Sequence, residues 1–206
     1  MRTVALTKES TKDILENLLK RSPNNYGKFE AAVDNILKNV KEKGDEALFA
    51  YTKEFDKTEI TGETIRVTEE EIKEAYEAVD PALIEVIRKA LVNIRSYHEK
   101  QRQNSWFTTE AKGTMLGQKV TPLERVGVYV PGGKAVYPSS VLMNIVPAKV
   151  AGVDQIVMTT PPGKDGKVNP STLVAAKEAG ADEIYKVGGA QAIGALAYGT
   201  ESIPKV

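Results

Sequence analysis

Two glycine-rich segments hold the residues of this sequence that are best suited to bind a ligand, 129–134 (YVPGGK) and 188–191 (GGAQ). Adjacent glycines let a ligand approach the backbone closely, and a helix N-terminus offers free amides and a positive dipole end to a phosphate. The side chain of Gln191 adds an amide that can both donate and accept hydrogen bonds. Either segment could bind a nucleotide or phosphate, or could serve only as a tight turn.

Neither segment matches a standard phosphate-binding motif. Val128 and Ala135 occupy positions at which a Walker A loop requires a glycine and a serine or threonine. The G-x-G-x-x-G fingerprint of dinucleotide-binding folds is also absent. The prediction of a nucleotide site therefore depends on where the two segments lie, between a strand and a helix, and not on a motif.

The sequence offers little for catalysis by an acid, a base, a thiolate or a metal. Its single histidine, His98, lies at the edge of an apolar helical stripe, which favours a packing role. There is no cysteine, so the thiolate chemistry of an aldehyde dehydrogenase and Cys-ligated metals are excluded. We predict that the chain contains no catalytic residue and no metal ligand.

Composition argues against two classes of partner. Lys plus Arg and Asp plus Glu both number 28, so no net field attracts nucleic acid or an anionic membrane. No apolar run has the length of a signal peptide core or of a membrane-spanning helix. We expect a cytoplasmic protein that binds neither nucleic acid nor membrane.

The elements that position the glycine-rich segments change in kind along the chain. Residues 1–104 show charged helical patterns, with a capping box at Thr68 and Glu71 and a helix start at Asp80-Pro81. In residues 105–206, short β-branched runs alternate with alanine-rich stretches, which predicts a parallel sheet of βαβ units. The predicted strands are 126–130, 155–160 and 183–187, and the predicted helices are 139–150, 170–179 and 190–198, after an entry strand or hairpin within 113–120.

An internal repeat supports the βαβ interpretation. Residues 151–156 (AGVDQI) are echoed by 179–184 (AGADEI), where each glycine ends a helix and each isoleucine begins a buried strand. Ligands of open parallel sheets bind beyond the carboxyl ends of the strands, so the loops after residues 130, 160 and 187 are the candidate positions. The last predicted helix has no strand after it, which predicts that the chain is a fragment of a longer protein.

Several blocks of this sequence resemble the histidinol dehydrogenase family. They are 44–48, 51–52, 55–56, 97–101, 124–133, 138–143, 147–148, 187–193 and 195–206. The blocks cover nearly the whole chain, and they are specific together although each one alone is weak.

The resemblance implies an enzyme of histidine biosynthesis, a homodimer with exchanged elements, that oxidises L-histidinol through the aldehyde to L-histidine with two NAD molecules and one zinc ion. It also implies a helical N-terminal region followed by an incomplete Rossmann-like parallel sheet, which agrees with the missing fingerprint. Tyr129 and Gln191 match positions that contact NAD in the family. The family's zinc ligands and its catalytic Glu-His pair come later in its sequence. The zinc ligands are therefore expected beyond residue 206, and the chain is expected to be inactive alone.

Two other interpretations remain open from the sequence. The chain could be a complete nucleotide-binding module with a helical interaction arm, which predicts a compact monomer. It could also be a structural protein in which residues 1–104 mediate assembly and both glycine-rich segments are only turns. That second alternative predicts no change in ligand response when Gln191 is substituted.

Overall fold

The computed structural model describes residues 5, 7–12, 27–132 and 136–206. The chain divides into two compact units, Met1–Asn35 and Ile36–Val206. The described parts of the first unit are mainly helical, and helix α2 (Gly27–Lys43) has residues in both units. The sheet and the candidate site belong to the second unit.

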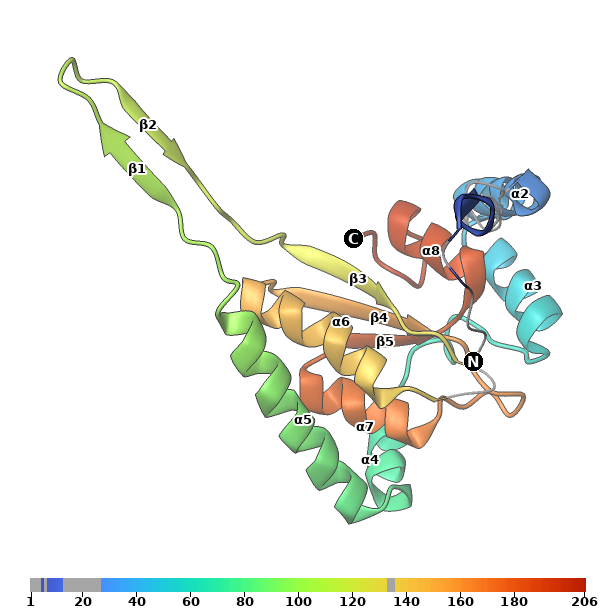
Figure 1. Ribbon diagram of the computed structural model, residues 1–206. Coiled ribbons are helices and arrows are strands. Elements are labelled where there is room, and N and C mark those ends of the chain that lie inside the picture. Colours follow the sequence, from blue (N-terminus) through green and yellow to red (C-terminus); the bar gives the residue numbers. More distant parts are fainter. Residues whose placement is uncertain (1–4, 6, 13–26, 133–135) are drawn as a thin grey trace. The chain divides into compact units, whose positions relative to one another are not determined.

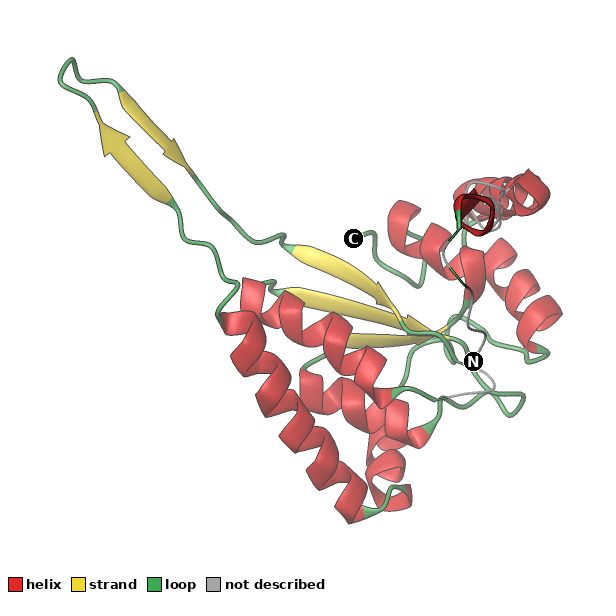
Figure 2. Cartoon of the chain, in the orientation of Figure 1, coloured by secondary structure: helices red, strands yellow, loops and turns green. Residues whose placement is uncertain are grey.

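The second unit contains a three-stranded sheet with helices on both faces and a separate hairpin, as Figure 2 shows. Besides the end of α2, its helices are α3 (Asp45–Asp56), α4 (Glu69–Ala78), α5 (Pro81–Glu99), α6 (Pro138–Ala151), α7 (Pro170–Ala179) and α8 (Gly189–Tyr198). Its strands are β1 (Trp106–Thr109), β2 (Met115–Gln118), β3 (Arg125–Tyr129), β4 (Gln155–Thr160) and β5 (Glu183–Lys186). The predicted α/β class is confirmed.

The sheet is parallel, in the order β3-β4-β5. Tyr129 lies beside Thr159, and Thr160 lies beside Lys186, so the three strands end at one common carboxyl edge. The positions of the three strands agree with the prediction to within one residue at each end.

The two faces of the sheet are covered by different helices because side chains alternate along each strand. Val128 and Met158 point into a core that they share with α4, α5, α6 and α7. Val157, Tyr185 and Val187 point to the opposite face, into a second core with α3 and α8. Figure 1 shows these two helical layers on either side of the sheet.

Capping signals decide where the helices of the first core begin. The Thr68 hydroxyl accepts from the Glu71 amide, and the Glu71 carboxylate accepts from the Thr68 amide, which confirms the predicted capping box. Asp80 caps α5, with Pro81 in its first turn, also as predicted. These helices precede the boundary predicted at residue 104 and share a core with helices that follow it. The boundary itself stays a prediction.

The repeated segments form two copies of one helix–strand connection. Gly152 ends α6 and Gly180 ends α7, both in the left-handed conformation, with φ of 90° and 93°. The second copy also braces the first, because the Asp182 carboxylate accepts a hydrogen bond from the Ile156 amide at 2.8 Å. Among the described residues, no helix has the length and apolar character needed to cross a bilayer.

The hairpin of β1 and β2 extends away from the sheet and its helices (Figure 1), and every residue of both strands is exposed. Its large apolar side chains, Trp106, Phe107, Met115 and Leu116, are each more than half exposed. The sequence predicted an entry element only within 113–120. The strand β1 was missed because four residues that bury neither face give no alternating apolar pattern.

Candidate functional site

The turn between β5 and α8 is built on two glycines at which a larger residue would clash with a neighbour or be strained. A Cβ atom at Gly188 would lie 2.6 Å from Cβ of Pro161. Gly189 has a φ of +68°, a conformation that favours glycine. The glycines therefore have a structural reason to be here, and they hold the start of α8 against the loop that follows β4.

Gln191, in the first turn of α8, is buried in this turn with its amide unsatisfied. Its side chain is 1% exposed, and neither Oε1 nor Nε2 has a hydrogen-bond partner in the described part of the chain. Leaving a buried polar group without a partner costs about 1–3 kcal/mol. Such a group marks a position at which a ligand, a water molecule or another chain can complete the hydrogen bonds.

Tyr129, the last residue of β3, reaches the same turn from across the carboxyl edge of the sheet. Its hydroxyl accepts a long hydrogen bond, 3.4 Å, from the amide of Gly189. A Cβ atom added to Gly189 would lie 2.5 Å from Oε1 of Gln191, so this glycine adjoins both side chains. The structure thus brings together the two residues that the sequence singled out, and their NAD-binding role stays a prediction.

Thr159 is a third polar residue of this group, and sequence reasoning missed it. It lies beside Tyr129 in the sheet, it is fully buried, and its hydroxyl has no partner within the described residues. A threonine in a β-branched strand gives no signal of this kind, because its methyl group suits a core equally well.

The loop after β3 approaches the same proline from the other side. A Cβ atom at Gly132 would lie 2.8 Å from Cγ of Pro161, so Pro161 lies between this loop and the turn before α8. Gly133 and Lys134, which belong to the predicted glycine-rich segment, lie outside the described residues.

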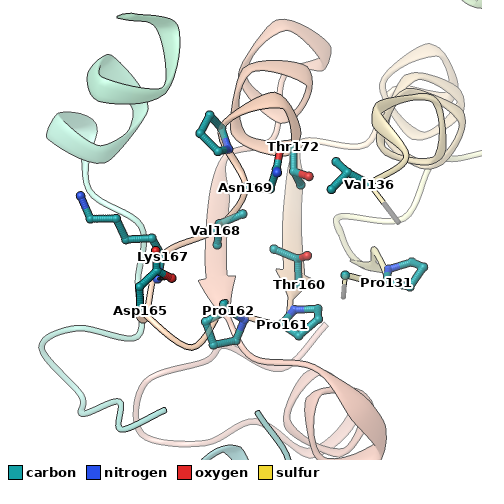
Figure 3. A pocket seen from close by; sticks show the side chains of 13 residues that line it. Pro131, Val136, Thr160, Pro161, Pro162, Asp165, Lys167, Val168, Asn169 and Thr172 are labelled. Carbon is teal, nitrogen blue, oxygen red and sulfur yellow. Dashed lines mark hydrogen bonds between the residues drawn. The ribbon is translucent and has the colours of Figure 1, made fainter. Parts of the chain in front are cut away.

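A cavity of about 380 Å³ opens on the α7 side of Pro161. It is formed by the loops after β3 and β4 and by the start of α7, and Figure 3 shows its lining, which includes Pro131, Thr160, Pro162 and Thr172. The sequence also named the loop after residue 160 as a candidate position at the sheet edge. It predicted no ligand-binding residue in that loop.

His98 lies at the end of α5 and does not line this cavity. Its Nδ1 atom is 2.7 Å from Oε1 of Gln101, and its side chain is half-buried. Over the described ranges, no three or more His, Cys, Asp or Glu residues are grouped so that they could hold a metal ion. The described residues therefore do not fit a zinc site.

Comparisons with known proteins identify what the chain is similar to. The family model for histidinol dehydrogenase matches residues 19–206. Among curated relatives, the histidinol dehydrogenases of Heliobacterium mobile and Methanocaldococcus jannaschii are 57% and 54% identical, over 89% and 97% of this chain. A crystal structure of histidinol dehydrogenase from Elizabethkingia anophelis is 39% identical, with a TM-score of 0.81 over 86% of this chain. The chain spans 43%, 46% and 41% of these three proteins, respectively.

Proposed function

The chain belongs to the histidinol dehydrogenase family, and on that basis we propose that it is part of an enzyme that oxidises L-histidinol to L-histidine with NAD. The activity is proposed for the whole enzyme, because the chain spans less than half of its relatives. The observation within this chain that best supports the proposal is the buried amide of Gln191, which lacks hydrogen-bond partners in the described part of the chain.

Tyr129 and Gln191 are the residues that would hold NAD. The Gln191 amide can donate and accept at once, which suits a carboxamide or a ribose hydroxyl of a dinucleotide. The Tyr129 hydroxyl, whose bond to the Gly189 amide is long, can donate its proton to the same ligand. When bound, NAD accepts a hydride from the substrate carbon, and the role of these residues is to position the dinucleotide at the sheet edge.

Zinc and the acid–base chemistry belong to the proposal for the whole enzyme and not to this chain. The described residues include no grouping of three potential metal ligands, and no step through zinc is assigned to them. We place the zinc ligands and the catalytic acid–base pair beyond residue 206, as the resemblance implies. The 206-residue chain should therefore bind NAD at most, without oxidising histidinol.

The exposed hairpin supports the proposal that the whole enzyme is a homodimer. Exposed apolar surface marks interaction sites, and the β1–β2 hairpin carries it on both faces, with Trp106 and Leu116 on one face and Phe107 and Met115 on the other. We also propose a cytoplasmic location, because a biosynthetic enzyme of this kind draws on the cytoplasmic pool of NAD.

Activity assays test whether the oxidation of histidinol requires the part of the enzyme beyond this chain. The purified chain, free of host enzyme, should form no NADH from L-histidinol and NAD, and histidinol-dependent NADH formation would contradict the proposal. The source reading frame, extended past Val206, should restore growth without histidine to a bacterial strain that lacks histidinol dehydrogenase. A natural stop codon after Val206 would also contradict the proposal that the chain is part of a longer enzyme.

Titration of the chain with NAD tests the site. Replacing Gln191 by leucine should weaken NAD binding about tenfold, the effect of losing roughly 1.4 kcal/mol of hydrogen bonding. The matched control is Gln103→Leu, the same change at an exposed position, and it should leave binding unchanged. Equal NAD affinity of the Gln191 and Gln103 variants would remove Gln191 from the site.

A further inference from the structure

The side-chain amide of Gln191 is out of reach of a ligand in this structure. The side chain is 1% exposed, and both Oε1 and Nε2 are shielded from solvent without a partner among the described residues. A hydrogen bond joins a donor and an acceptor that are about 2.7–3.2 Å apart. A dinucleotide at the surface therefore cannot bind this amide until the atoms that cover it move.

The backbone of Gly189 lies against the amide. A Cβ atom at Gly189 would lie 2.5 Å from Oε1 and 3.2 Å from Nε2 of Gln191, so this glycine faces both polar atoms. Gly189 itself is exposed to solvent. Moving this one residue outward would uncover the amide.

The start of α8 is held less firmly than the starts of its neighbours. Side chains cap α4, α5 and α7, whereas Gly188, the N-cap of α8, has no side chain. The Gly189 amide donates a hydrogen bond to the Tyr129 hydroxyl, and at 3.4 Å this bond is longer than usual. The contact between Gly189 and Tyr129 is therefore weak enough to be broken without disturbing the helix.

The residues on either side of Gly189 are fixed, which confines the movement to the turn. Gly188 packs against Pro161, because a Cβ atom at Gly188 would lie 2.6 Å from Cβ of the proline. Further along α8, Ala192 and Leu196 are buried in the core that α8 shares with α3. Glycine changes between positive and negative φ at little cost, so Gly189 can turn while the rest of α8 stays in place.

We propose that Gly189 is a gate over Gln191, and that its bond to the Tyr129 hydroxyl holds the gate shut in the free protein. NAD contacts the Gln191 amide only when the gate is open. The measured affinity for NAD is then lowered in proportion to the fraction of molecules in the open form. The inference rests on the proposed function, in which Tyr129 and Gln191 hold NAD.

Gly189→Ala tests the gate because it strains the closed form. Alanine disfavours a φ of +68°, and its Cβ atom would overlap Oε1 of Gln191. The open fraction should rise, so the dissociation constant for NAD, measured by calorimetry, should fall about fivefold, the equivalent of roughly 1 kcal/mol. The matched control is Gly113→Ala in the hairpin turn, where φ is +82° and nothing lies within 4 Å of the added Cβ atom. It should leave the NAD affinity unchanged.

A second measurement needs no ligand and covers the case in which Gly189→Ala does not fold. In the unchanged chain, the NMR signal of the Gln191 side-chain amide should resist broadening by a soluble gadolinium chelate. The chelate should broaden that signal in Gly189→Ala and also in Tyr129→Phe, which removes the oxygen that holds Gly189. In Gly113→Ala the signal should stay as sharp as in the unchanged chain.

Two results would overturn the gate. One is an NAD affinity of folded Gly189→Ala that is equal to or weaker than that of the unchanged chain. The other is equal broadening of the Gln191 signal in the unchanged chain and in Tyr129→Phe. If either occurs while Gln191→Leu weakens NAD binding, the Gln191 site stands and the gate alone falls. If Gln191→Leu binds NAD normally, the Gln191 site falls, and the gate falls with it as a step in NAD binding.

Discussion

Buried polar groups are paired at the junction between α4 and β5, whereas those around the turn before α8 have no hydrogen-bond partner among the described residues. At the junction, the Lys186 ammonium donates to one oxygen of Glu71 at 2.8 Å, while the other oxygen of Glu71 accepts from the Thr68 amide. Lys186 is only 6% exposed, so water screens this pair poorly. At the turn, Gln191 and Thr159 are buried as deeply, but their side-chain polar atoms lack partners in the described part of the chain.

The difference separates polar groups that support the fold from polar groups available to a ligand. A buried group that is fully paired destabilises the protein when its partner is removed, because the remaining charge or dipole stays desolvated. A buried group without a partner already carries that cost, so removing it should stabilise the free protein. Replacing a polar side chain by an apolar one should therefore lower the free energy of unfolding at the junction and raise it at the turn.

Glu71→Ala should have the largest effect. The variant leaves the buried Lys186 ammonium without its partner and removes the capping box with Thr68. We expect the free energy of unfolding to fall by about 3 kcal/mol, as for other broken buried ion pairs. Urea denaturation at pH 7 measures it. Glu70→Ala changes a neighbouring exposed carboxylate in the same helical turn and should cost about 0.5 kcal/mol or less. Equal losses in the two variants would contradict the role given to the ion pair.

Gln191→Leu should act in the opposite direction. Leucine has a similar size and removes an amide whose two polar atoms are unsatisfied. We expect the free energy of unfolding to rise by about 1 kcal/mol, while NAD binding weakens. Thermal or urea denaturation without ligand measures the first effect, and Gln103→Leu is the exposed control. A loss of stability in Gln191→Leu would show that the amide is bonded in the free protein, and the contrast between the two regions would fail.

Glu178 provides a second paired group, and its effect should depend on pH. Its carboxylate accepts hydrogen bonds from Arg88 and Tyr76, and the bond from Arg88 is the main reason that the pKa of Glu178 lies below its ordinary value of 4.5. The folded state therefore favours the ionised carboxylate. Its stabilising effect is present above the unfolded pKa and is lost as the pH falls through the folded pKa.

Glu178→Gln should therefore cost about 1 kcal/mol at pH 7, a modest value because the Arg88 side chain is half exposed. The difference from the unchanged chain should shrink as the pH falls below 4.5. Unfolding free energies between pH 7 and the acid limit of the folded state, from urea titrations, give this profile. Glu85→Gln, at a more exposed partner of Arg88, should give a small difference at every pH. A Glu178→Gln difference that does not change with pH would contradict the assignment.

Local signals in the sequence predicted the elements, because those signals act over a few residues. The capping box at Thr68 and Glu71 and the helix start at Asp80-Pro81 need no information from the rest of the chain. The repeat also locates two helix ends and two strands by itself. For the same reason the sequence could not predict that α4 and α5 share a core with α6 and α7, since that depends on contacts between distant segments.

The state of each buried polar group could not be predicted either. Glu71 and Lys186 are 115 residues apart, and nothing near either one indicates the pair. Thr159 and Thr160 are adjacent in one apolar strand but point to opposite faces of the sheet, Thr159 beside Tyr129 and Thr160 into the wall of the cavity next to Pro161. The two glycine-rich segments and the Gln191 amide were identified as a candidate site from their residues, and the family resemblance then pointed to Tyr129 and Gln191 as NAD contacts, but their burial and contacts became visible only in the structure.

Phe107→Ser, in the hairpin, should have the smallest effect on the fold. Phe107 is 61% exposed, so the free energy of unfolding should change by about 0.5 kcal/mol or less. Phe107 and Trp106, the chain's single tryptophan, lie on opposite faces of the hairpin. If copies of the protein meet so that both faces are covered, the fluorescence of Trp106 should shift to shorter wavelength as the protein concentration rises. The Phe107 variant should move that shift to higher concentration, whereas Thr108→Ser should not. Emission that is independent of concentration, with a monomer in sedimentation, would remove the hairpin from the proposed dimer surface.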